Sequence, residues 1–166
     1  MAQKVLDDLF YDALQDIYFA ERQILKALPK MARGATDPKL KAAFEEHRDQ
    51  TEQHVERLQQ IFEMIGKRAQ GKTCEAIQGI LGEGEEILEE YKGAPALDAG
   101  LISSAQAVEH YEITRYGTLK AWAARLGHKD AVKLLDSTLQ EESATDANLT
   151  KLAESAVNQA AQKKAA

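Results

Sequence analysis

Apolar residues recur every three to four positions along most of this 166-residue chain, the spacing that places them on one face of an α-helix. The pattern predicts long helices at residues 4–33, 38–66, 98–126 and 130–160, and a shorter one at 73–92. The predicted fold class is therefore all-α. Two helical hairpins would form a four-helix bundle, joined by a crossover that carries the short extra helix.

Glycine and proline positions support these boundaries. Gly34, Gly66 and Gly127 are expected to end the first, second and third long helices, because glycine tolerates the backbone geometry beyond a helix C-terminus. The run Thr36-Asp37-Pro38 provides an N-cap followed by proline at the first helical position. Pro29 is expected to kink or loosen the last turns of the first helix, since it lacks a backbone N–H.

Composition narrows the function classes. The length and the 44% hydrophobic content suit one domain, residues 1–166, whose Ala/Gln/Lys-rich end (160–166) is expected to fray. A net charge of −6 without a dense basic run argues against nucleic-acid binding. No apolar stretch is long enough for a membrane span. The single Cys74 rules out an internal disulfide and, with the polar N-terminus, predicts a cytoplasmic protein.

Polar residues interrupt the middle of all four long apolar stripes. Glu21 stands between Ile17 and Ile24 on the expected buried face of the first helix. The other interruptions are His47, Gln50, Thr51 and His54 in the second helix, Glu109 and Glu112 in the third long helix, and Glu142, Thr145 and Asp146 in the fourth. A helix rises about 1.5 Å per residue, and antiparallel neighbours at one level lie equally far from their shared turn. Counting residues from each hairpin turn therefore places the interruptions at one level along the bundle.

Several carboxylates in a dry interior must be protonated, paired or neutralised by a cation. The predicted metal ligands are Glu21, Gln50, His54, Glu109, Glu112, Glu142 and Asp146. Carboxylates with imidazole suit iron, as a single ion or a di-iron pair, or manganese or zinc. The alternative is a metal-free layer of protonated acids and hydrogen-bonded polar groups that fixes the helix register.

Other polar residues near this level are not expected to be metal ligands. Taken singly, His47 and Thr51 are more typical of satisfied core residues than of ligands, and Tyr111 and Tyr116 are expected to pack rather than to relay electrons. His110 is expected to face outward and His128 to lie in a turn. The glutamates expected to point off the stripe are Glu45, Glu46, Glu52 and Glu141.

Short motifs along the chain resemble the YciF/YciE group of bacterial stress proteins. They are Ala20-Glu21-Arg22-Gln23, Leu28-Pro29-Lys30, residues 47–51, Val108-Glu109-His110-Tyr111-Glu112-Ile113, Tyr116-Gly117-Thr118-Leu119, Leu139-Gln140-Glu141-Glu142 and Thr145-Asp146. The resemblance covers nearly the whole chain and implies a ferritin-like fold. It also implies a stress-associated, often dimeric protein, and Glu109 with Glu112 is similar to the iron-binding Glu-x-x-Glu of rubrerythrins.

Two departures separate this chain from a standard di-iron protein. The usual Glu-x-x-His is replaced by Thr51-x-x-His54 and Glu142-x-x-Thr145, and Gln50 stands where the group is expected to carry glutamate. A mononuclear or vacant site is therefore also possible on sequence grounds.

Two functions follow from the sequence. The first is a metal-binding, redox-active protein that reacts with a small oxidant such as peroxide or dioxygen. The second is a non-enzymatic structural or partner-binding stress protein with a metal-free polar layer. A homodimer is expected in either case, and neither an iron-storage shell nor DNA binding is favoured.

Overall fold

The computed structural model describes residues 3–162, and within this range the chain is all-α, as predicted. The helices are α1 (Leu6–Gly34), α2 (Pro38–Met64), α3 (Glu75–Glu90), α4 (Leu97–Leu126), α5 (Lys129–Leu152), a π-helical turn η1 (Ala153–Val157) and α6 (Asn158–Ala161). Residues 1–2 and 163–166 of the predicted domain, including most of the tail expected to fray, lie outside this description.

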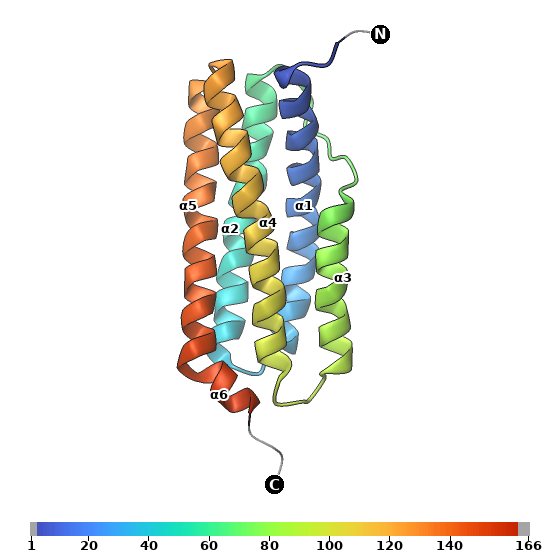
Figure 1. The fold of residues 1–166 in the computed structure, drawn as a ribbon, viewed down its shortest axis with the longest axis vertical. Helices are drawn as coiled ribbons and strands as arrows, with labels where there is room; N and C mark the ends of the chain where they lie inside the picture. The colour runs from blue at the N-terminus through green and yellow to red at the C-terminus, as the bar shows by residue number, and fades with distance from the viewer. Residues whose placement is uncertain (1–2, 163–166) are drawn as a thin grey trace.

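The four long helices pack as two antiparallel pairs, α1 with α2 and α4 with α5 (Figure 1). The pairs meet where α1 contacts α4 and α2 contacts α5. The connection between the pairs carries α3, which lies on the outside against α1 and α4. The interior enclosed by the long helices therefore receives side chains from all four.

Local signals in the sequence explain most helix ends. The Asp37 carboxylate accepts hydrogen bonds from the backbone N–H groups of residues 39 and 40, at 2.8 and 3.0 Å, and Pro38 occupies the first helical position. Gly66 and Gly127 have positive φ angles of 67° and 81°, which are accessible to glycine at little cost. The predicted N-cap of α2 and the predicted end of α4 are thus confirmed.

Helix α1 ends at Gly34, as predicted, and it includes Pro29, because proline removes one backbone donor while the rest of the last turns stays hydrogen-bonded. The end of the last long helix differs from the prediction. The expected helix 130–160 ends as regular α-helix at Leu152 and continues through η1 into α6. No glycine or proline marks this change in the sequence, so the pattern gave no signal for it.

Asp98, near the start of α4, fixes the turn between α1 and α2. Its carboxylate accepts hydrogen bonds from the Thr36 backbone N–H at 2.9 Å, the Thr36 hydroxyl at 2.5 Å and the Asp37 backbone N–H at 2.7 Å. Asp98 is only 7% exposed. These bonds tie the two helix pairs together at one end.

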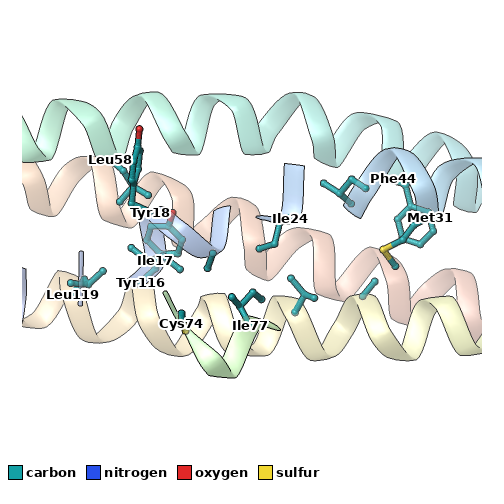
Figure 2. Packing of buried hydrophobic residues seen from close by; sticks show 14 of the residues in the cluster. Ile17, Tyr18, Ile24, Met31, Phe44, Leu58, Cys74, Ile77, Tyr116 and Leu119 are labelled. Carbon is teal, nitrogen blue, oxygen red and sulfur yellow. The ribbon is translucent and has the colours of Figure 1, made fainter. Parts of the chain in front are cut away.

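The apolar core extends along the long axis of the protein. Figure 2 shows Ile17, Leu58 and Leu119 towards one end and Phe44 and Met31 towards the other. All five are at least 93% buried. On α1 and α2 the polar stripe residues lie between these two ends in sequence, so apolar side chains flank them on both sides.

Within residues 3–162 we find no helix with the length and hydrophobicity of a membrane span.

Candidate metal centre

Six buried acidic and histidine side chains meet at mid-height between the long helices. They are Glu21 from α1, His47 and His54 from α2, Glu109 and Glu112 from α4, and Glu142 from α5, and we call them the core cluster. None is more than 4% exposed. Each helix delivers its residue here because the side chain continues that helix's buried stripe.

The core cluster contains two groups of donor atoms, each compact enough for one cation. The first comprises His47, Glu109, Glu112 and Glu142, and the second comprises Glu21, His54 and Glu142. Within each group the ligand atoms all lie within 4.8 Å of one another. Glu142 belongs to both groups.

The two oxygens of Glu142 face different histidines. Oε1 lies 3.0 Å from His54 Nδ1, and Oε2 lies 3.7 Å from His47 Nε2. His47 Nε2 is also 3.0 Å from Glu109 Oε1, and His54 Nδ1 is 3.5 Å from Glu21 Oε1. One carboxylate therefore spans both donor groups.

The outward nitrogen of each histidine faces an oxygen acceptor. His54 Nε2 lies 2.8 Å from Glu141 Oε2, and His47 Nδ1 lies 3.4 Å from Gln50 Oε1. A proton on each outward nitrogen leaves the inward nitrogen with a free lone pair. This is the arrangement in which imidazole binds a metal, with its second N–H held by a carboxylate or carbonyl.

Glu141 is itself held by a cation at the surface. Arg57 donates two hydrogen bonds to the Glu141 carboxylate, at 2.7 and 2.9 Å. This pair lowers the pKa of Glu141, so the carboxylate stays ionised beside His54. On the opposite side of the core cluster, the buried Tyr116 hydroxyl donates a hydrogen bond to Glu21.

Burial and mutual repulsion control protonation in the core cluster. Burial raises the pKa of Glu109 to about 8 and that of Glu142 to about 7, and burial together with Glu142 raises the pKa of Glu112 well above its ordinary value. Burial alone would lower the pKa of His54. The adjacent carboxylates of Glu142 and Glu21 outweigh it and raise that pKa to about 11.

Several donor atoms have no hydrogen-bond partner among residues 3–162. Both oxygens of Glu112 are unpartnered, as are Glu21 Oε2 and Glu109 Oε2. Buried polar atoms without partners are costly, and carboxylate oxygens beside imidazole nitrogens suit a divalent iron or manganese ion. The residues therefore fit the metal that the sequence predicts.

The structure brings together five of the seven predicted ligands. Glu21, His54, Glu109, Glu112 and Glu142 are all buried in the core cluster. Whether any of them binds a metal stays a prediction.

The other two predicted ligands lie outside the core cluster. Gln50 is half-buried at its edge and contacts His47 and Thr145 rather than the carboxylates. Asp146 points towards the surface, where it accepts a hydrogen bond from Gln106 at 3.1 Å and pairs with His110 at 3.2 Å. One helical step of four residues turns Asp146 by about 40° from Glu142, which is enough to move it off the buried face.

Sequence reasoning missed two residues of this region. His47 joins the core cluster, although taken singly it looked like a core histidine. Its spacing of seven from His54 places both on one helix face two turns apart, and that spacing was the available signal. Glu141 is a hydrogen-bond partner of His54, and no sequence pattern shows its pairing with Arg57.

The remaining assignments agree with the structure. The His110 side chain is 70% exposed, and His128 precedes the first turn of α5. Thr51 is buried, and its hydroxyl donates to the backbone carbonyl of His47 at 2.7 Å. Tyr111 packs against the core, with its hydroxyl 3.1 Å from the sulfur of Cys74.

Comparison with known proteins identifies relatives over nearly the full chain. Protein YciF of Escherichia coli (strain K12) is 42% identical, and the match covers 99% of this chain and 100% of the relative. The crystal structure of this E. coli stress protein superimposes with a TM-score of 0.89 over 95% of this chain and 99% of that one. YcfI of Rhodopseudomonas palustris is 45% identical, with a TM-score of 0.85, over 89% and 94% of the two chains.

A protein of Xanthomonas campestris shares the fold, with a TM-score of 0.72 at 21% identity over 93% of this chain and 94% of that one. Residues 5–162 match the family described as a domain of unknown function, DUF892. On this match and the identity to YciF, the chain belongs to the DUF892 family, as a YciF-like member.

Proposed function

We propose that this chain is a ferritin-like, stress-associated protein whose core cluster binds two ions of iron or manganese. The ferritin-like topology is supported by two antiparallel helix pairs joined by a connection that carries α3. The stress association is supported by the relationship to the E. coli stress protein YciF.

The observation that carries the proposal is the orientation of the two histidines. Each turns one ring nitrogen towards buried carboxylates and presents the other to an acceptor outside the core cluster. The two histidines lie on either side of the Glu142 carboxylate. Each would hold one ion, and Glu142 belongs to both donor groups. The histidine missing from Glu142-x-x-Thr145 is compensated, because His47 of α2 provides the second imidazole beside Glu142.

Iron or manganese bound here would supply electron transfer towards a small oxidant such as peroxide or dioxygen. The residues of this chain would hold the ions, compensate their charge and exclude bulk water. Glu141, fixed by Arg57, would keep the proton of His54 on Nε2. Tyr116 would hold one oxygen of Glu21 and thereby orient that carboxylate.

A metal-free structural role is the second candidate, and the protonation of the core cluster favours it. A cationic His54 beside Glu21 and Glu142, with Glu109 and Glu112 protonated, would leave at most one carboxylate charge uncompensated without any metal. The relative from R. palustris is described as a candidate structural protein. The unpartnered oxygens of Glu112 weigh against this alternative, since a structural layer gains little from unsatisfied atoms.

Metal analysis of the full chain, purified without a tag or chelator, separates the two functions. We expect up to two iron or manganese ions per chain, and stoichiometric uptake when Fe²⁺ or Mn²⁺ is titrated into protein stripped of metal. Protein that is free of metal and takes up neither ion would contradict the proposal and favour the structural role. The expected homodimer stays a prediction, which sedimentation would check against twice the chain mass of 18.4 kDa.

A further inference from the structure

A cavity of about 230 Å³ opens onto one half of the core cluster. His47 and Glu109 form part of its lining, whereas the other four cluster residues do not. The His54 half is closed by its neighbours, because Glu141 occupies His54 Nε2 and Tyr116 covers Glu21. The two proposed ion positions therefore differ in access, and the one at His47 faces a space that a second molecule could enter.

The walls of the cavity are apolar, and its mouth combines polar side chains with alanines. Buried residues of the wall include Ile24, Phe44, Val108 and Leu149, from α1, α2, α4 and α5. Half-buried or exposed residues lie at the mouth between α2 and α5, and they are Ala43, Gln50, Ala144, Thr145 and Asn148. A molecule entering here would pass polar groups first and then contact apolar side chains.

The floor offers polar atoms that lack partners. Glu109 is 2% exposed, and its Oε2 has no hydrogen-bond partner within residues 3–162, which is also true of His47 Nε2. The lining contains the acidic residues Glu46 and Glu109 but no lysine or arginine. An anionic head group would find no counter-charge from the protein, whereas a neutral hydrogen-bonding head group would be accommodated.

The size of the cavity limits the ligand. An apolar cavity of about 150 Å³ accommodates benzene, so a cavity half as large again suits roughly eight to ten non-hydrogen atoms. A straight alkyl chain with one terminal polar group has this volume and matches the division between apolar wall and polar floor.

We propose that this cavity is the substrate pocket of the His47 half of the core cluster. It takes a neutral amphiphile, a short alkyl chain with a hydroxyl-type head, with the head directed to His47 and Glu109. As a substrate assignment it rests on the proposed metal function, but binding to the cavity requires only the geometry described here.

Titration of the metal-free full chain with 1-octanol, followed by NMR, tests occupancy. We expect saturable shifts of the methyl signals of Ile24, Val108 and Leu149, and binding that tightens about fourfold per methylene from 1-butanol to 1-octanol. Octanoate should bind more weakly than 1-octanol. Ala144→Trp, at the exposed mouth, should abolish the shifts, whereas Ala147→Trp, an exposed alanine of the same helix outside the lining, should leave them unchanged.

Mn²⁺ then tests the orientation, because this paramagnetic ion relaxes nearby protons most strongly. In Mn²⁺-loaded protein, the head-group CH₂ of bound octanol should broaden more than the terminal methyl. Equal binding to the Ala144→Trp variant, no dependence on chain length or stronger broadening of the methyl would each overturn the pocket assignment. Octanol binding by protein that takes up neither Mn²⁺ nor Fe²⁺ would support the cavity while overturning the proposed metal function, so the two failures are distinguishable.

Discussion

Replacing Glu109 and Glu112 together with glutamine separates the metal-binding role of the core cluster from a purely structural one. Both carboxylates belong to the donor group around His47, and both are at least 98% buried. Glutamine keeps the shape of each side chain but cannot carry a negative charge. The change therefore removes two of the four donors at one proposed ion position without opening a cavity.

In the metal-free protein the expected effect depends on pH. Burial raises the pKa of Glu109 to about 8 and that of Glu112 well above its ordinary value, so at pH 7 glutamine replaces two neutral acids and stability should change by less than about 1 kcal/mol. At pH 9.5 Glu109 ionises next to Glu142. Charges up to 4.8 Å apart repel by about 3.5 kcal/mol at an effective dielectric of 20, so the variant should then be the more stable protein.

With metal the effect should have the opposite sign. Free Mn²⁺ at a hundred times its dissociation constant stabilises the wild type by about 2.7 kcal/mol, which raises the Tm of a chain of this size by roughly 5–10 °C. The double variant keeps only the donor group around His54 intact, so its rise should be at most about half as large under the same conditions. Melting curves with chelator and with Mn²⁺, at pH 7 and 9.5, measure both effects.

A matched control changes Glu86 and Glu89 to glutamine. These residues have the same spacing of three on α3, and both are exposed. The control should keep the full Mn²⁺-dependent rise in Tm. If the core double variant kept that rise as well, the metal assignment would be refuted. A loss of about 1–3 kcal/mol in its metal-free stability at pH 7 would instead show a structural hydrogen-bond network.

Three further changes have defined outcomes. Gln50→Glu should tighten Mn²⁺ binding about tenfold, because a carboxylate would hold the Nδ1 proton of His47. The control Gln53→Glu, at an exposed position of the same helix, should leave the affinity unchanged. Calorimetric titration measures both affinities. Without metal, the raised pKa values of the buried acids and of His54 mean that the folded state binds extra protons. The free energy of unfolding should thus fall from about pH 5 to 9, by up to ~1.4 kcal/mol per pH unit for each such group. Bound Mn²⁺ should reverse this trend. Chemical denaturation at several pH values in this range measures the sign of the slope. Asp98→Ala should cost about 2–4 kcal/mol in denaturant melts, because three donors lose their acceptor, and should leave Mn²⁺ affinity unchanged.

The sequence predicted the buried acids well, because each stands inside an apolar stripe whose period is that of the helix. Glu21, Glu112 and Glu142 are all 0% exposed. The same reasoning failed for Asp146. The buried face of a helix is about 100° wide, and a side chain at its edge can point either into the core or towards solvent. In the structure Asp146 contacts Gln106 and His110 instead of the core cluster.

The contacts around the core cluster could not be predicted in the same way. The pairing of Glu141 with His54 and Arg57 depends on how α2 and α5 are placed against each other, and periodicity within one helix contains no such information. The cavity beside His47 has the same origin, because its lining comes from five helices. The helix ends, in contrast, depend on local residues such as Asp37 and Gly127, and these were predictable.

The wide separation in sequence of the residues in and around the core cluster has a consequence for unfolding kinetics. His54 and Glu141 are 87 positions apart, and Tyr116 and Glu21 are 95 apart, so these contacts can form only after the two helix pairs have docked. An ion held by this cluster would be absent from early folding intermediates and would contribute little to the rate of folding. Its free energy would appear almost entirely as slower unfolding, which makes metal loading a determinant of how long the folded protein persists.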